Sequence, residues 1–221
     1  NPMIRSFKLL FVLLLAGVAS GTFAQQTYRA NNWEASIQLI GTSSEKFDGA
    51  GGSSLDVDSE IGLGAGFTYN FSQHLALGFD MLWVRPDYKS VFVTEEGETV
   101  SVKHTMSVFN GQFNGTWNIL DGPSTPYLQA GLGWTYVDSN VADGPPTTGC
   151  WWDPWWGYIC RNYFSTYSDT YFSYGIGAGL RWEFGNGMFL KGSYNRLEID
   201  GSNGINPNFD TAKLELGWIF R

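Results

Sequence analysis

The feature that most constrains the fold of this chain is a strict alternation of apolar and polar residues, repeated along almost its whole length. Successive side chains of a β-strand point to opposite faces, so this alternation predicts strands with one apolar and one polar face. Eight segments show it, at 33–39, 61–71, 75–83, 109–119, 128–136, 172–184, 188–194 and 212–220. The sequence therefore predicts an all-β fold with an even number of strands.

The connections between these segments alternate in length. Short connections lie at 72–74, 121–126 and 185–187, whereas the other four are long and rich in Gly, Pro, Asp and Ser. This pattern is typical of an antiparallel transmembrane β-barrel with short periplasmic turns and long extracellular loops. A soluble ligand-binding barrel would have an apolar interior. Here the polar face carries seven charged residues and many glycines, so we expect the large apolar side chains to face lipid and the small and polar ones to fill the interior.

Composition excludes three other classes of protein. Aromatic residues make up 17% of the chain, which is far more apolar surface than disordered chains contain. The formal net charge is −8, and no basic stripe is present, so no nucleic-acid partner is expected. The mean hydropathy of −0.16 is too low for a helical membrane protein.

The N-terminus has the pattern of a secretory signal peptide. Arg5 and Lys8 precede an apolar run at 9–16, and small residues follow up to Ala24. The run is shorter than the roughly 20 residues that a spanning helix needs. We therefore expect a signal peptide over 1–24, with Asn1 and Pro2 as leading scar residues, and a β-barrel domain over 25–221.

Architecture and two sequence segments carry a resemblance to a known family. The segments are Phe71-Ser72-Gln73-His74-Leu75-Ala76-Leu77 and Glu215-Leu216-Gly217-Trp218-Ile219-Phe220-Arg221. The chain resembles the small OmpA-like and OmpX-like outer-membrane barrels over residues 25–221. Members end in an assembly signal, which Gly217, Trp218 and Phe220 match up to its last position. Either a final aromatic residue follows in the natural chain, or Phe220 takes its place.

The resemblance implies a location and a set of partners. The location is the outer membrane of a Gram-negative bacterium, reached through the periplasm. The partners are outer-membrane lipid, lipopolysaccharide and the barrel-assembly machinery, and the barrel is expected to be a monomer.

Seven charged residues are predicted to point into the barrel. They come mainly from the first strand and the last three, which become neighbours when the sheet closes. Unpaired charges are costly in a low-dielectric interior, so the mixed signs favour a paired network that plugs the lumen. The alternative is an ion path or gate. The seven residues are Glu34, Asp80, Arg181, Glu183, Lys191, Lys213 and Glu215.

The segment between Cys150 and Cys160 is the most unusual part of the chain. Two cysteines on one exported loop are expected to form a disulfide. Asp153-Pro154 favours a turn, which would place the aromatic residues at a hairpin tip. They either pack against other loops or the membrane interface, or form a recognition surface for an extracellular glycan, lipid or protein. These candidate surface residues are Trp151, Trp152, Trp155, Trp156 and Tyr158.

Three classes of function remain. The first is a structural or surface-interaction protein, and the second is a small porin or conduit for small or apolar solutes. The third, an outer-membrane lipid-modifying enzyme, is disfavoured because His74 and His104 show no spacing to a nucleophile and an acid. We therefore expect no catalytic residue, no metal site and no cofactor.

Overall fold

The structure is a computed structural model that describes residues 29–48, 54–93, 99–145, 147–163, 165–201 and 207–221. The predicted signal peptide at 1–24 lies outside these residues. Within them, no helix is long and apolar enough to cross a bilayer. The described strands are β1 (Asn32–Thr42), β2 (Glu45–Asp48), β3 (Ser54–Val57), β4 (Ile61–Asn70), β5 (Leu75–Val84), β6 (Asp87–Val93), β7 (Thr99–Thr105), β8 (Ser107–Asn118), β9 (Ser124–Ala142), β10 (Thr147–Asp153), β11 (Gly157–Tyr163), β12 (Thr166–Glu183), β13 (Met188–Asp200) and β14 (Asn208–Phe220).

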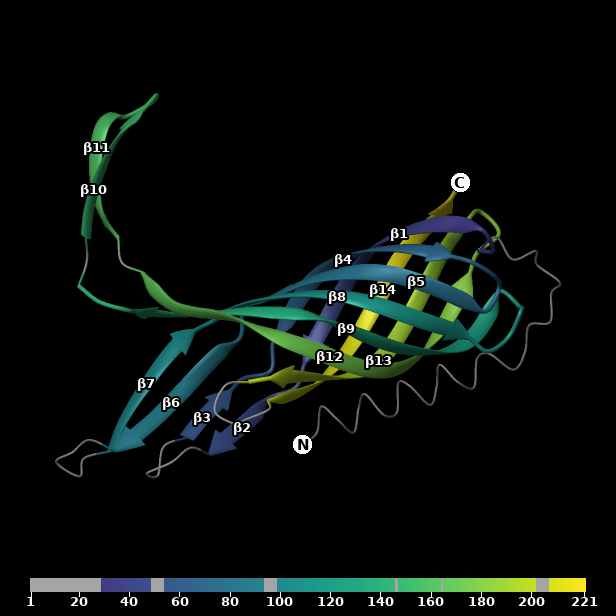
Figure 1. Cartoon of the computed structure of the whole chain (residues 1–221), viewed down its shortest axis with the longest axis horizontal. Helices are drawn as coiled ribbons and strands as arrows, with labels where there is room; N and C mark the ends of the chain where they lie inside the picture. The colour runs from purple at the N-terminus through teal and green to yellow at the C-terminus, as the bar shows by residue number, and fades with distance from the viewer. Residues whose placement is uncertain (1–28, 49–53, 94–98, 146, 164, 202–206) are drawn as a thin grey trace.

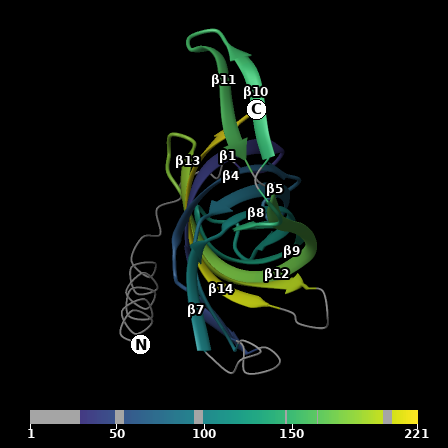
Figure 2. The same cartoon turned by 90° about the vertical axis from the view of Figure 1, so that its left-hand side faces the viewer.

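Eight of these strands close into a barrel, in the order β1-β14-β13-β12-β9-β8-β5-β4. Every neighbouring pair is antiparallel, and the first strand pairs with the last from Trp33 opposite Phe220 to Thr42 opposite Thr211. Figure 2 shows the strands as a ring. All eight barrel strands coincide with the eight alternating segments, so the predicted fold class is confirmed.

The alternation places large apolar side chains on the outside of the barrel. Two belts of outward-facing aromatic residues ring it, one near the short turns and one near the long loops. On β8, Trp117 lies in the first belt and Phe109 in the second; the eight residues of separation span about 27 Å along the strand. A strand tilt of 35–45° turns this length into a height of about 19–22 Å, slightly less than the ~25 Å apolar band of outer-membrane barrels. The turn-end belt includes Trp33, Phe67, Phe71, Trp117, Trp218 and Phe220, and the loop-end belt includes Trp83, Phe109, Trp134, Tyr136, Tyr174 and Tyr194.

The long connections form structure of their own beyond the barrel (Figure 1). The connection between β1 and β4 and the connection between β5 and β8 join in a four-stranded sheet, with strand order β2-β3-β6-β7. Strands β9 and β12 continue past the barrel, and β10 and β11 form a separate two-stranded hairpin between them. The sequence did not predict the four-stranded sheet.

Candidate functional site

The interior near the short turns is filled by an ion-paired cluster centred on Arg181. Its guanidinium donates two hydrogen bonds to the carboxylate of Glu34, at 2.6 and 3.0 Å, and one to Glu183 at 2.8 Å. All three side chains are buried. The strand alternation brings them together, because β12 and β1 both present these positions to the inside.

Arg29 completes this cluster, and sequence reasoning missed it. The residue precedes β1, is fully buried, and pairs with Glu183 at 2.9 Å. Its remaining N–H groups donate to the main-chain carbonyls of Gln73 and Leu120, both at 2.6 Å, and of Gly122 at 3.1 Å. Arg29 therefore ties the segment before the first strand to two of the short turns and closes that end of the barrel.

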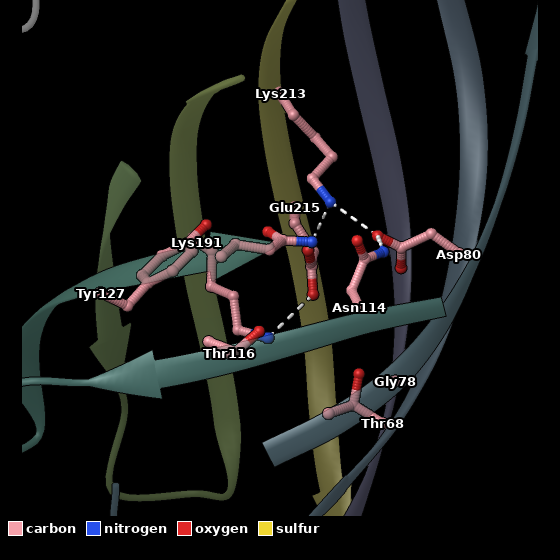
Figure 3. A pocket seen from close by; sticks show the side chains of 10 residues that line it. Thr68, Gly78, Asp80, Asn114, Thr116, Tyr127, Lys191, Lys213 and Glu215 are labelled. Atoms are coloured by element: carbon pink, nitrogen blue, oxygen red, sulfur yellow. Dashed lines mark hydrogen bonds and ion pairs between the residues drawn. The ribbon is translucent and has the colours of Figure 1, made fainter. Parts of the chain in front are cut away.

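A second cluster fills the middle of the lumen (Figure 3). Lys191 lies between Glu34 and Glu215, with its Nζ 3.1 Å from a carboxylate oxygen of each. Lys213 pairs with Asp80 at 2.8 Å and lies 3.8 Å from Glu215. Gln38 and Asn114 donate to the two oxygens of Asp80. The structure thus brings all seven sequence-predicted lumen charges into one connected network.

The complete network is electrically neutral. Four acids (Glu34, Asp80, Glu183 and Glu215) face four bases (Arg29, Arg181, Lys191 and Lys213), and all eight are buried. The seven residues predicted from strand alternation leave one negative charge over, and Arg29 supplies the missing positive charge.

Phe189 adds an aromatic element that the sequence reasoning also missed. Its ring is fully buried, with the guanidinium carbon of Arg181 at 4.6 Å from the ring centroid and the Nζ of Lys191 at 4.5 Å. These are cation–π distances. Gly217 of the predicted assembly signal faces the same ring, and a Cβ at this position would overlap Phe189 and approach the carbonyl oxygen of Ala35 to 2.6 Å. Trp218 and Phe220 point outward from the same strand.

Little free volume remains inside the barrel. A cavity of about 10 Å³ lies among Asp80, Tyr127 and Lys213, and another of about 40 Å³ lies closer to the long loops. One water molecule needs about 10–15 Å³ by this measure. Within the described residues, the buried atoms Asn110 Oδ1 and Gln112 Nε2 have no hydrogen-bond partner, and both residues line the larger cavity. The two cavities therefore fit a few water molecules and not a solute.

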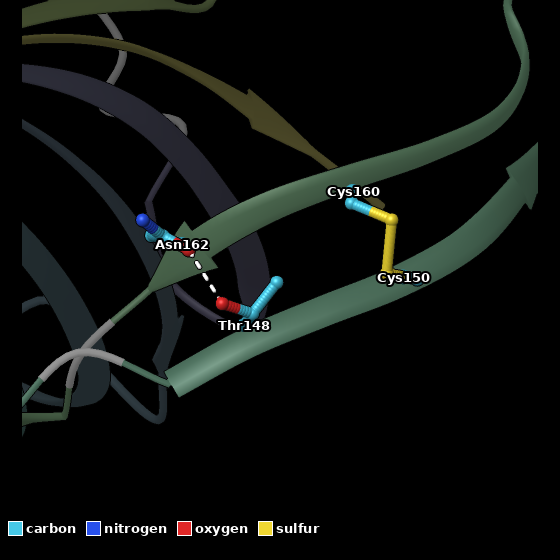
Figure 4. Close-up of a disulfide and its surroundings, with 4 residues drawn as sticks. All are labelled: Thr148, Cys150, Cys160 and Asn162. Atoms are coloured by element: carbon cyan, nitrogen blue, oxygen red, sulfur yellow. Dashed lines mark hydrogen bonds between the residues drawn. A yellow bond between two sulfur atoms is a disulfide. The ribbon is translucent and has the colours of Figure 1, made fainter.

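The β10–β11 hairpin carries the predicted aromatic surface. Cys150 and Cys160 are directly opposite in the register and form a disulfide, as predicted (Figure 4). Two pairs further from the tip, Thr148 donates a hydrogen bond of 2.7 Å to Asn162. The disulfide and this hydrogen bond fix the register of the hairpin.

At the hairpin tip, Asp153 holds a tight turn. Its carboxylate accepts hydrogen bonds from the main-chain N–H groups of Trp155 at 2.9 Å and Trp156 at 3.0 Å. Gly157 follows with a φ of 75°, a conformation that favours glycine. This turn places Trp155 and Trp156 in solvent, 83% and 79% exposed. Trp152 and Tyr158 are opposite each other on one face and are 69% and 72% exposed, whereas Trp151, on the other face, is 46% exposed.

Comparison with known proteins supports the architecture. The family model of the outer membrane protein beta-barrel domain matches residues 10–220. Among solved structures, OprG of Pseudomonas aeruginosa superimposes with a TM-score of 0.54 at 12% identity, covering 89% of this chain and 99% of OprG. Ail of Yersinia pestis, solved in complex with the heparin analogue sucrose octasulfate, gives a TM-score of 0.50 at 16% identity, covering 86% of this chain and 99% of Ail. No curated protein matches the chain.

Proposed function

Because this chain belongs to the outer membrane protein beta-barrel domain family, we propose that it is a surface-interaction protein: the barrel is its membrane anchor, and the β10–β11 hairpin is its recognition surface. It resides in the outer membrane of a Gram-negative bacterium. The observation that carries the proposal is the tip of the hairpin, where a disulfide and a tight turn hold four aromatic side chains at 69–83% exposure.

The lumen supports an anchoring role over conduction. Eight charged side chains neutralise one another across it, and the two cavities hold only a few waters. A conduit would require several of these ion pairs to break together, and removing one partner of a buried pair costs about 3–5 kcal/mol. The same pairs occupy the interior carboxylates and amines that acid–base chemistry would need. We therefore do not favour the porin or the lipid-modifying enzyme.

The exposed aromatic residues support recognition. An aromatic side chain can bury about 150–250 Å² in an interface, and Trp and Tyr are frequent interaction hot spots. The hairpin is already ordered by its disulfide, so little conformational entropy would be lost on binding. Exposed apolar patches of this kind mark interaction sites.

Charge narrows the class of ligand. The loop side of the chain carries 16 of the 21 acidic residues and six basic ones. Ail forms a complex with a sulfated sugar, but a polyanion of that kind would be repelled by the net acidic loops of this chain. We propose a ligand without strong negative charge, either a neutral extracellular glycan or an apolar protein surface, that stacks on Trp155 and Trp156.

The test is a binding screen with purified protein in nanodiscs against an array of neutral and sulfated glycans and against extracellular matrix proteins. The variant Trp155→Ala/Trp156→Ala should lose at least about tenfold in affinity, as expected for hot-spot residues. Tyr167→Ala is the matched control, because Tyr167 is an exposed aromatic residue outside the hairpin. Equal binding by the wild type and the double variant, or selective binding of sulfated glycans, would overturn the proposal.

A further inference from the structure

One face of the β10–β11 hairpin consists of three cross-strand pairs whose side chains all meet solvent. Successive side chains of a strand alternate between its two faces, so the pairs two residues to either side of the disulfide share its face. The pair nearer the tip is aromatic, and the pair nearer the barrel carries a hydroxyl and an amide. From the tip, the pairs are Trp152 with Tyr158, Cys150 with Cys160, and Thr148 with Asn162. All six residues are exposed, and we call this surface the hairpin face.

The hairpin face carries no charged side chain. The charged residues of the hairpin, Asp153 and Arg161, lie on the opposite face. The carboxylate of Asp153 is also occupied in the turn, where it accepts the main-chain N–H groups of Trp155 and Trp156. A charged ligand would find no group of opposite charge on the hairpin face, so the ligand that suits it is uncharged.

The aromatic end of the hairpin face offers two rings to a ligand. Trp152 and Tyr158 are directly opposite each other in the register, and they are 69% and 72% exposed. The face of an aromatic ring is electronegative, so it attracts the polarised C–H groups on the flat side of a sugar ring. Two neighbouring rings thus give stacking positions for a sugar chain.

The polar end of the hairpin face lies about 14 Å away along the strands. The Thr148 hydroxyl donates to Asn162 Oδ1 at 2.7 Å, which holds the amide in one orientation (Figure 4). Within the part of the chain that the structure describes, the Nδ2 group of Asn162 donates to no protein atom. This amide can therefore donate to a ligand, and the oxygen of the Thr148 hydroxyl can still accept. A sugar hydroxyl both accepts and donates, so it matches this pair.

The size of the hairpin face favours a small ligand over a protein. A standard protein interface uses roughly 20–30 residues on each side, whereas the hairpin face has six. Sites for small molecules combine aromatic and apolar side chains with a few well-placed polar groups. The hairpin face has this combination, with two rings at one end and an oriented amide at the other.

We propose that the hairpin face binds a linear, uncharged oligosaccharide, whose sugar rings stack on Trp152 and Tyr158 and whose hydroxyl groups further along reach Asn162. This inference rests on the proposed function, and it selects the neutral glycan over the protein surface as the ligand. It also extends the site from the tip to the polar pair near the base of the hairpin. The disulfide lies between the two ends and fixes their spacing, so the ligand must be long enough to span them.

The experiment titrates full-length protein in nanodiscs with uncharged oligosaccharides of glucose, galactose, mannose and N-acetylglucosamine, each as a series from monosaccharide to hexasaccharide. Calorimetry and Trp fluorescence report binding. In at least one series the affinity should rise with chain length until the ligand spans the hairpin face, and then level off. The variant Thr148→Val/Asn162→Leu keeps most of the side-chain volume and should weaken binding of the long members roughly fivefold to tenfold, the effect of about one hydrogen bond. Trp152→Ala/Tyr158→Ala should abolish binding of the whole series.

Arg161→Gln is the matched control, because Arg161 is next to Asn162 in the sequence but lies on the opposite face of the hairpin. It should bind the series as the wild type does. Limited proteolysis within 147–163 at the wild-type rate shows that the hairpin is folded in each variant.

The outcomes separate this inference from the proposed function. Affinity that does not depend on chain length, or wild-type affinity of the folded Thr148→Val/Asn162→Leu variant, would overturn the inference. The proposed function would still stand if Trp155→Ala/Trp156→Ala lost binding. Binding to extracellular matrix proteins that survives enzymatic removal of their glycans would identify a protein ligand and would also overturn the inference alone. Binding to no glycan and no protein would overturn both.

Discussion

At the scale of single residues, the interior of this barrel depends on the balance of its charges. Strand parity alone places seven charged residues inside, because every second residue of a strand shares a face. Arg29 could not be placed this way, since it precedes the first strand and belongs to no alternating pattern. The sequence indicates Arg29 only indirectly. The predicted interior has four acids and three bases, so one further base is needed to make it neutral. Phe189 has the inward parity of Lys191 but was not expected among charges.

Arg29→Met tests this balance. The substitution keeps much of the side-chain volume but leaves Glu183 short of one partner and three main-chain carbonyls without their donor. Breaking a buried pair costs about 3–5 kcal/mol, so the midpoint of thermal unfolding in detergent should fall clearly. Arg161→Met, at an exposed arginine, is the control and should leave the midpoint unchanged. An unchanged midpoint for Arg29→Met would mean that water replaces the lost contacts.

At the scale of elements, the apolar–polar alternation of the sequence predicts only the strands that cross the bilayer. Within the membrane one strand face meets lipid and the other meets a polar interior, so alternation is strong and all eight barrel strands are predicted. Beyond the membrane no strand face meets lipid, and the alternation of large apolar and polar residues fades. The outer parts of β9 and β12 and the strands of the four-stranded sheet therefore carried no clear signal. The β10–β11 hairpin was predicted, because its cysteines and its Asp153-Pro154 turn give local signals.

The hairpin and the barrel should respond differently to reduction of the disulfide. Closing a loop of this size with a disulfide contributes roughly 2–3 kcal/mol to stability in the chain-entropy model. Strands β10 and β11 pair with each other and with no barrel strand, so this contribution is local to the hairpin. Cys150→Ser/Cys160→Ser should therefore leave the β-sheet circular dichroism spectrum and the heat resistance nearly intact. Limited proteolysis should cut the variant within 147–163 faster than the wild type. Loss of membrane insertion would instead identify the hairpin as an assembly element.

At the scale of the whole molecule, the two ends of the barrel differ in structure. The short turns, together with Arg29, close one end, whereas sheet and hairpin extend from the other. In an outer-membrane barrel the short turns face the periplasm. The loop end then faces the outside, with its four-stranded sheet and its aromatic hairpin.

Peptide tags test this orientation. A tag inserted in the turn at 185–187 should escape antibody labelling on intact cells, and a tag in the connection at 201–207 should be labelled. After permeabilisation both tags should be labelled, which controls for expression. Labelling of both tags on intact cells would contradict the orientation.

The ion pairs of the lumen also join the beginning of the chain to its end. Glu34 on the first barrel strand meets Arg181 and Lys191, 147 and 157 residues later, and Asp80 meets Lys213 after 133 residues. These contacts have a very high contact order, so they cannot form until the last strands arrive. A chain that stops before those strands would hold Glu34 and Asp80 without their cations. The charge network thereby couples stable insertion to completion of the chain, and it disfavours partly made barrels in the membrane.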